Sequence, residues 1–387
     1  MVKRLIMREV RTCAREFPVL TIFGPRQSGK STLAEMCFPD KPRLSFEDPD
    51  AREQAEEDPR GLLNSLQKGA ILDEIQRVPH ILSYLQGMVD SKSTAGRFIL
   101  TGSHQPSLRE AVTQSLAGRT AVLTLLPFCL AEMASYRKTW NAFDLLVSGF
   151  YPRLHEQKIR PASFFSAYMQ TYLERDVRMM LNVRDLRPFQ QVMALLAGRV
   201  GQLINYTSLA NDTGVSVPTI RSWVSVLEAS HILLLLPPYS ENITKRVVKP
   251  SKIYFTDPGL AAWLAGVRTA EEAAKGMMRG GLYENLVIVD LFKQRLNEGE
   301  TPQFFFYRDN HGNETDLIIR HNRKVIPIEI KSAETFHTDF HKGISYFRKL
   351  VPTAAPGYIL YNGERETRIH DTRVLNLLHI ANGEVFK

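Results

Sequence analysis

The amino-acid sequence predicts an α/β protein of more than one domain, and three observations support this. In the first third of the chain, short apolar runs alternate with longer amphipathic segments, which is typical of a mostly parallel, buried β-sheet. The chain has 387 residues, which exceeds what one hydrophobic core usually serves. Its 44% apolar and 23% charged residues are ordinary for a globular protein and argue against a mostly disordered chain.

Five apolar runs of the first domain are predicted to be strands, with helices between them. These runs are Val19–Phe23, Arg43–Phe46, Ala70–Leu72, Arg97–Leu100 and Ala121–Leu126. The first run leads directly into a Gly-x-x-x-x-Gly-Lys-Ser pattern and then into a helix. This junction predicts a phosphate-binding loop, because backbone N–H groups wrap phosphates at the positive end of the helix. The loop consists of Gly24, Pro25, Arg26, Gln27, Ser28, Gly29, Lys30 and Ser31.

The residues of this loop have separate predicted roles. Gly24 and Gly29 permit the tight turn, and Lys30 reaches the β- and γ-phosphates of ATP. Ser31 offers its hydroxyl to Mg²⁺, and Thr32 is expected to contact the nucleotide beside it. The sequence therefore predicts ATP and Mg²⁺ as cofactors.

An acidic pair at the end of the third run is expected to complete the metal site. Within the segment 70–75, Asp73 would hold the Mg²⁺ shell, because phosphate-bound Mg²⁺ needs an acid at the end of a neighbouring buried strand. Glu74 would position or deprotonate the attacking water, which distinguishes a hydrolysing ATPase from a passive binder. The alternative is two exposed acids at a strand end.

Two further residues are candidates for sensing the γ-phosphate. Ser103 ends the fourth strand, with Thr101 as second choice, although hydroxyl residues at strand ends are also ordinary turn formers. Arg119 precedes the last strand and would reach the γ-phosphate of a neighbouring copy, which implies a homo-oligomer. Alternatively, Arg119 pairs with a surface acid.

Together these segments resemble a group of prokaryotic AAA-type ATPases. The resemblance continues into a C-terminal region that is labelled as a domain of unknown function in that group. It implies an ATPase core, which we place at 1–130, a helical and winged-helix domain at 131–270, and a restriction-endonuclease-like α/β domain at 271–387. It rests on Gly24–Ser31, Leu72–Arg77, Leu100–Ser103, Leu116–Arg119, Tyr172–Val177 and Lys252–Gly259.

The middle of the chain has the pattern of a helix-turn-helix. A helix over 192–200 is followed by a short helix over 208–213, a turn at Gly214, and a helix over 217–229 that Ser216 caps. If this module binds DNA, the second helix enters the major groove. The alternative is a protein-docking module.

Two further groups of residues belong to this middle segment. The runs 231–236 and 252–255 would pair as a β-hairpin wing. The side chains expected to contact DNA are Thr219, Arg221 and Ser222 at the bases and Lys245, Arg246 and Lys249 of the wing at phosphates. Arg175 and Asp176 are interpreted as a structural ion pair, with a functional pair as the alternative.

The C-terminal region is predicted to fold as a helix, three strands, a helix and a strand. Asp316 on the second strand, with Glu329 and Lys331 on the third, forms a D…ExK arrangement that would bind Mg²⁺ between adjacent strands. Lys331 would orient water or offset phosphate charge, and Glu284 of the preceding helix would complete the metal shell. The alternative is a salt-bridged pair in a degenerate fold, because Thr315 stands where many such nucleases have proline.

The composition limits the cellular setting. The longest aliphatic stretch, 231–238, is far too short to cross a bilayer, so no membrane partner is expected. The N-terminal segment 1–16 has no signal-peptide pattern. The three cysteines are widely spaced, which predicts no disulfide framework or zinc site and fits a reducing cytoplasm. A net charge of +8 is compatible with a polyanion partner such as DNA.

The leading hypothesis is an ATP-hydrolysing AAA-type switch whose partner is DNA. Its nuclease-like C-terminal domain would cut DNA with Mg²⁺. The rival is an ATP-gated regulatory or protein-interaction switch whose C-terminal half is not catalytic. A small-molecule kinase would also use the phosphate loop, but it would need an acceptor pocket and lid, and no segment of the sequence suggests them.

Overall fold

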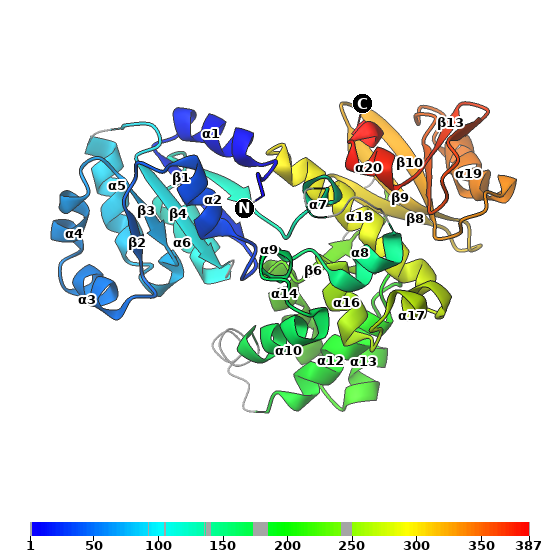
Figure 1. The fold of residues 1–387 in the computed structure, drawn as a ribbon, viewed down its shortest axis with the longest axis horizontal. Coiled ribbons are helices and arrows are strands. Elements are labelled where there is room, and N and C mark those ends of the chain that lie inside the picture. The colour runs from blue at the N-terminus through cyan, green and yellow to red at the C-terminus, as the bar shows by residue number, and fades with distance from the viewer. Residues whose placement is uncertain are drawn as a thin grey trace. The chain divides into compact units, whose positions relative to one another are not determined.

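The computed structural model describes residues 2–91, 93–103, 106–134, 136, 141–172, 185–240 and 250–386 (Figure 1). The residues Arg175, Asp176, Lys245, Arg246 and Lys249 lie outside this described part. The chain divides into two compact units. The first comprises Met1–Phe128, Ala229–His231 and Arg295–Glu300, and the second comprises Cys129–Glu228, Ile232–Gln294 and Thr301–Lys387.

A five-stranded parallel sheet forms the centre of the first unit, in the order β2-β3-β4-β1-β5. The β1 and β4 strands are buried at every position, because helices cover both faces of the sheet. This arrangement confirms the parallel α/β domain that the apolar runs predict. The strands are β1 (Val19–Gly24), β2 (Arg43–Ser45), β3 (Ala70–Asp73), β4 (Phe98–Ser103) and β5 (Thr120–Thr124).

The helices of the first unit form two layers, one on each face of the sheet. Successive side chains of a strand point to opposite faces, so Leu20 and Ile22 pack with α1 and α2, whereas Val19 and Phe23 pack with α3 to α6. The helices are α1 (Met7–Glu16), α2 (Lys30–Cys37), α3 (Pro49–Glu57), α4 (Pro59–Ser65), the 3-10 turn η1 (Ile75–Arg77), α5 (Ile81–Ser91) and α6 (Pro106–Ser115).

The second unit begins with a helical region that contains a helix-turn-helix. Asn205 caps α13, which ends at Gly214 in the left-handed conformation (φ 70°), and α14 follows. The β6 strand (Leu233–Leu236) pairs antiparallel with β7 (Lys252–Phe255). The helices are α7 (Leu130–Met133), α8 (Ala142–Ser148), α9 (Pro152–Glu156), α10 (Pro161–Tyr172), α12 (Arg187–Gly198), α13 (Tyr206–Thr213), α14 (Val217–Ala229), α16 (Pro258–Leu264), α17 (Ala270–Lys275) and α18 (Arg279–Asn297).

A six-stranded mixed sheet ends the second unit, in the order β12-β13-β11-β10-β9-β8. The β8, β9 and β10 strands are antiparallel, whereas β10, β11 and β13 are parallel. The elements are β8 (Phe304–Arg308), β9 (Glu314–His321), β10 (Lys324–Lys331), η3 (Thr338–His341), α19 (Lys342–Leu350), β11 (Tyr358–Tyr361), β12 (Thr367–Ile369), β13 (Thr372–Leu375), α20 (Leu377–Ala381) and η4 (Glu384–Phe386).

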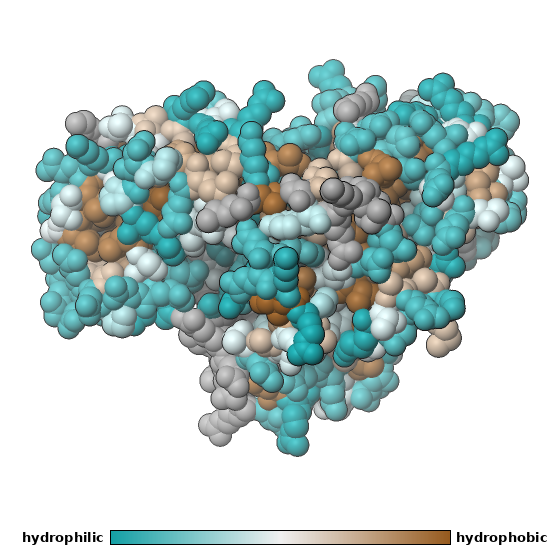
Figure 2. All heavy atoms as spheres, in the orientation of Figure 1, coloured by the Kyte–Doolittle hydropathy of each residue, from teal (hydrophilic) through white to brown (hydrophobic). Residues whose placement is uncertain are grey.

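The surface carries no extended apolar band on the face shown in Figure 2, where hydrophilic residues predominate and hydrophobic ones are scattered. Large apolar side chains that are exposed occur singly along the described chain, which is normal for a folded protein. Within the described residues, no helix is both long and apolar enough to span a membrane. The exposed residues are Leu5, Tyr84, Val122, Met277, Leu350 and Leu378.

Candidate functional site

The predicted phosphate loop lies between the end of β1 and the start of α2. Two of its positions require glycine. A Cβ atom on Gly24 would lie 2.1 Å from the carbonyl oxygen of Leu125, and Gly29 has a φ of 91°. The loop is therefore packed closely against the end of β5, and it turns into the helix through a left-handed residue.

The Lys30 ammonium lies against the loop itself. The side chain is buried, and its Nζ donates hydrogen bonds to the carbonyl oxygens of Gly24 at 3.1 Å and Pro25 at 2.9 Å. Phosphate oxygens are stronger acceptors for an ammonium than carbonyl oxygens, because they are charged. Lys30 is thus placed where it could exchange these carbonyls for a phosphate.

Arg4, which the sequence analysis missed, braces the loop from the N-terminal segment. Its guanidinium donates to the carbonyl oxygen of Ser28 at 2.9 Å and to that of Leu126 at 2.7 Å, and it lies 4.9 Å from the Phe128 ring centroid. A buried arginine so far from the loop in sequence gives no local signal of this role.

Asp73, the last residue of β3, contacts side chains of α2, β4 and β2. Its Oδ1 accepts a hydrogen bond from Ser31 Oγ at 2.8 Å and another from Thr101 Oγ1. Its Oδ2 accepts from Arg43 Nη2 at 2.5 Å and from Arg43 Nε at 3.2 Å. The predicted Ser31 and Asp73 therefore meet, although 42 positions separate them.

This oxygen pair fits Mg²⁺. A serine hydroxyl and a carboxylate are ligands that Mg²⁺ prefers, and Asp73 is buried, which holds its carboxylate in place. Arg43 was not expected here. It also forms an ion pair with Glu35, so a metal bound at Asp73 would have the Arg43 charge beside it.

Glu74 has a strained backbone at the end of β3. Its φ of 59° is in the left-handed region, which is uncommon for a residue with a side chain and often marks a functional position. The carboxylate accepts a hydrogen bond from the Gln76 side-chain amide. A Cβ atom on Gly102 would lie 2.7 Å from Gln76 Oε1, so the glycine of β4 makes room for Gln76.

The two candidate γ-phosphate sensors differ in their surroundings. Ser103 lies beside Gly24 in the register of β4 and β1, and its buried Oγ has no hydrogen-bond partner among the described residues. An unsatisfied buried hydroxyl beside the loop suits a ligand oxygen. Arg119, by contrast, donates to both carboxylate oxygens of Asp90, at 2.5 and 2.9 Å, so an acid of its own chain holds it.

A second group of sequence-predicted residues meets between β9 and β10. Lys331 Nζ donates to Asp316 Oδ2 at 3.1 Å and to Glu329 Oε2 at 2.6 Å. Asp316 Oδ2 also accepts from the backbone N–H of Ile330 at 2.8 Å. The D…ExK residues therefore form one ion-pair cluster, as expected for adjacent antiparallel strands.

Burial shapes the electrostatics of this cluster. Burial and the nearby Asp316 raise the pKa of Glu329 well above its ordinary value. Burial lowers the pKa of Lys331, but Asp316 and Glu329 outweigh it, so the Lys331 pKa is raised. Glu329 Oε1 has no partner within the described chain, and a Cβ on Gly343 would lie 1.8 Å from it. Two carboxylates with one unsatisfied oxygen fit a divalent cation.

Glu284, the predicted third ligand, has other partners. Its Oε1 accepts from Lys252 Nζ at 2.9 Å and from Tyr254 OH at 2.5 Å. Burial raises the pKa of Glu284 to about 6, although the positive charge of Lys252 opposes this. Lys252 also pairs with Glu314 at 2.5 Å. Within the described residues, no group of three or more His, Cys, Asp or Glu side chains is placed to hold a metal ion together.

The sequence gives no prediction for Lys252 at this site. Lys252 belongs to β7, which was expected only to form a strand of the wing, and its side chain is almost fully buried. A signal was present in the alternation of Lys252 and Tyr254, which places both polar groups on one face of an apolar strand.

Two of the three residues of α14 that are expected to contact DNA bases are exposed. Arg221 and Ser222 of α14 are exposed, and the Arg221 guanidinium lies 4.1 Å from the Tyr206 ring centroid. Thr219 is half-buried and its backbone N–H donates to Ser216 Oγ, which caps the helix as predicted from its position.

Three parts of the chain are similar to known protein families. Residues 16–134 match a family model described as an AAA domain. The first unit is therefore similar to AAA-type domains, and residues 16–134 are called the AAA-type domain below. Residues 139–271 and 279–380 match two families that are each described only as a domain of unknown function.

Relatives extend beyond the AAA-type domain. The chain is 29% identical over 333 residues to uncharacterized proteins of Mycobacterium bovis and Mycobacterium tuberculosis, covering 84% of this chain and 73% of each relative. It is 22% identical over 239 residues to an uncharacterized protein of Haemophilus influenzae, covering 58% of this chain and 57% of that one.

Two solved structures are similar to the chain at low sequence identity. A Walker-type ATPase of Pyrococcus abyssi has a TM-score of 0.43 at 15% identity, over 67% of this chain and 94% of that one. A RuvB variant of Thermotoga maritima has a TM-score of 0.31 at 18% identity, over 59% of this chain and 86% of that one.

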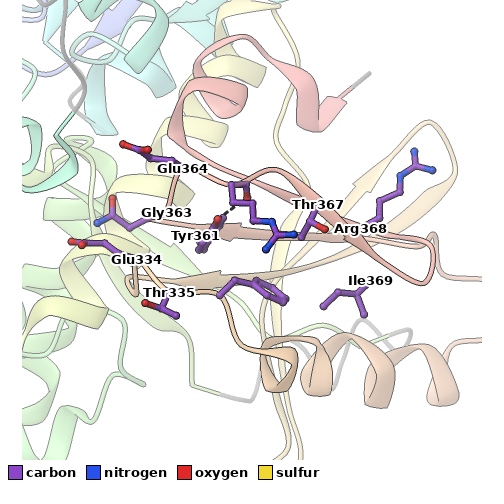
Figure 3. A pocket seen from close by; sticks show the side chains of 11 residues that line it. Glu334, Thr335, Tyr361, Gly363, Glu364, Thr367, Arg368 and Ile369 are labelled. Carbon is purple, nitrogen blue, oxygen red and sulfur yellow. Dashed lines mark hydrogen bonds between the residues drawn. The ribbon is translucent and has the colours of Figure 1, made fainter.

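Outside the AAA-type domain, a hollow of about 770 Å³ opens at the carboxyl ends of β10 and β11 (Figure 3). Tyr361 lines this hollow, and its OH donates to the carbonyl oxygen of Arg365 at 2.6 Å. None of the predicted site residues lines it. Its lining comprises Glu334, Thr335, Phe336, Tyr361, Asn362, Gly363, Glu364, Arg365, Thr367, Arg368 and Ile369.

Proposed function

We propose that this protein is an ATP-hydrolysing AAA-type switch that contacts DNA. ATP binding is supported above all by the hydrogen bond of 2.8 Å from Ser31 Oγ to Asp73 Oδ1. Ser31 is the last residue of the phosphate loop, in which two positions require glycine. A P-loop hydroxyl and a strand-end acid at this distance are what a nucleotide-bound Mg²⁺ requires.

The predicted site residues of the AAA-type domain have separate roles in this proposal. Lys30 and the backbone N–H groups of the loop bind the phosphates, while Ser31 and Asp73 would hold Mg²⁺. When bound, Mg²⁺ neutralises charge on the phosphate oxygens. Glu74 accepts the proton of the attacking water, and the unsatisfied Ser103 hydroxyl donates to the γ-phosphate.

Arg119 and oligomerisation belong to the same proposal. An arginine finger acts on a neighbouring copy, so Arg119 would have to leave Asp90 when copies assemble. The pair with Asp90 is partly exposed, and exposed ion pairs stabilise a protein little, so this exchange costs little free energy.

Contact with DNA is supported by the helix-turn-helix of α13 and α14. The exposed Arg221 lies on the second helix of this motif, which is the helix that enters the major groove in DNA-binding versions. The net charge of +8 favours a polyanion as the partner. The rival role for the same module is docking of another protein, which would make the chain an ATP-gated regulator.

A second candidate function is Mg²⁺-dependent cleavage of DNA by the C-terminal domain. The convergence of Asp316, Glu329 and Lys331 favours it, because carboxylates on adjacent strands beside a lysine suit metal-assisted attack on a phosphodiester. Lys331 would orient the attacking water or offset phosphate charge. If this site does not cleave, the C-terminal half is a regulatory or protein-interaction module.

One incubation tests ATP turnover, DNA contact and cleavage together. Purified protein is mixed with ATP, Mg²⁺ and supercoiled plasmid, and released phosphate and nicked plasmid are measured. We expect phosphate release that plasmid changes, and nicking that Asp316→Asn abolishes and the exposed control Asp339→Asn retains. Absence of phosphate release would refute the ATPase. Absence of nicking would leave the non-catalytic alternative. Phosphate release that plasmid does not change would argue against DNA contact.

A further inference from the structure

The acidic side chains around the D…ExK cluster form two pairs, and each pair surrounds one lysine. Asp316 and Glu329 contact Lys331 Nζ at 3.1 and 2.6 Å. Glu284 and Glu314 contact Lys252 Nζ at 2.9 and 2.5 Å. The second pair is built from α18 and β9, and its lysine comes from β7. Each of these two carboxylate pairs surrounds a lysine ammonium. Two such pairs of carboxylates resemble the ligand set of a site for two metal cations.

The two lysines differ in how easily a metal could displace them. The Lys331 side chain is 31% exposed and stands at the end of β10, so its ammonium can move into solvent. The Lys252 side chain is only 3% exposed, and its strand residue pairs with Leu236 of β6. Its ammonium also lies 5.7 Å from the Phe306 ring centroid. The Lys252 ammonium is therefore held more firmly in the protein than that of Lys331.

We propose that Lys252 is a fixed cation that fills one of two cation positions, so that this site binds a single divalent ion, at Asp316 and Glu329. The inference rests on the proposed nuclease-like site. A divalent ion between Glu284 and Glu314 would have to share their oxygens with a buried ammonium, and like charges at such distances repel strongly away from water. Glu284 is then a partner of Lys252 rather than a metal ligand.

This assignment gives the β6–β7 hairpin a second role. The hairpin was expected only to contact DNA, yet its Lys252 supplies a positive charge beside Asp316, and its Tyr254 orients Glu284. Lys252 is therefore a positioning residue of the C-terminal site, contributed by the preceding domain of the same unit.

Counting bound Mn²⁺ tests the proposal. The full chain carries Asp73→Asn, which removes the metal ligand of the AAA-type domain, and Mn²⁺ is titrated without nucleotide by calorimetry and by the electron paramagnetic resonance of free Mn²⁺. We expect one Mn²⁺ per chain in this background, and two when Lys252→Met is added. The exposed control Lys324→Met should keep one. Circular dichroism checks that each variant is folded.

The outcomes separate the proposal from the function on which it rests. No bound Mn²⁺ in the Asp73→Asn background would refute the nuclease-like metal site itself. If the Asp73→Asn background already binds two Mn²⁺, only the role of Lys252 is overturned. The same holds if this background binds one Mn²⁺ and still binds one after Lys252→Met is added. If Lys252→Met does not fold, Glu284→Gln decides. The proposal expects one Mn²⁺ to remain bound, and loss of the ion would show that Glu284 is a ligand.

Discussion

Replacing Glu74 with glutamine is expected to lower kcat for ATP hydrolysis by about 10²- to 10⁴-fold, the usual contribution of a general base. ATP binding should persist, because Glu74 is placed to act on water and not on the phosphates. The glutamine keeps the size of the side chain and its contact with Gln76, but it cannot accept a proton. Phosphate release under single-turnover conditions measures the chemical step directly.

The control for this variant is Glu57→Gln, which changes an exposed acid of α3 in the same way. It should hydrolyse ATP at the wild-type rate. If Glu74→Gln also hydrolyses ATP at that rate, the attacking water is activated by another group and the strained backbone at Glu74 has a different purpose.

The largest loss of stability is expected from Asp257→Ala. Asp257 is fully buried, and its carboxylate accepts from the backbone N–H groups of Phe150 at 2.7 Å and Leu260 at 2.9 Å. Alanine would leave both donors unsatisfied, remove the cap of α16 and leave the buried Lys293 without this counter-charge. We expect the free energy of unfolding of the second unit to fall by about 3–5 kcal/mol.

Tryptophan fluorescence during urea unfolding can measure this loss, because all three tryptophans belong to the sequence ranges of the second unit. The exposed acid Asp185, replaced with alanine, is the control and should leave the unfolding midpoint nearly unchanged. An equally small effect of Asp257→Ala would show that the buried network does not stabilise this unit. The tryptophans are Trp140, Trp223 and Trp263.

The sequence was most informative where structure is set by neighbouring residues. Gly24 and Gly29 were predicted because a tight loop before a helix needs glycine locally, whatever the rest of the fold does. The meeting of Ser31 and Asp73 was expected from one further rule, that phosphate-bound Mg²⁺ needs an acid at the end of a neighbouring buried strand. Asp316 and Glu329 met for a similar reason, since a short hairpin joins their strands.

The features that escaped prediction depend on contacts between distant segments. Arg4 and Arg43 reach the phosphate-loop region from outside its motif, and nothing near them in sequence marks the residues they contact. The sequence predicts that Glu284 completes the metal shell from its helix, but it does not predict that Lys252 of β7 pairs with Glu284. The short β12 and β13 strands were not predicted, because Thr367–Ile369 and Thr372–Leu375 are too short for a clear alternating pattern.

Equilibrium binding of a fluorescent ATP analogue with Mg²⁺, compared between the wild type and Lys30→Ala, tests the central claim most directly. The wild type should bind saturably, and Lys30→Ala should bind about 10- to 100-fold more weakly, because one charge-assisted contact to phosphate is lost. Lys68→Ala, an exposed lysine of the same unit, should bind like the wild type. No binding by the wild type, or equal binding by Lys30→Ala, would contradict the assignment of Gly24–Ser31 as a nucleotide site.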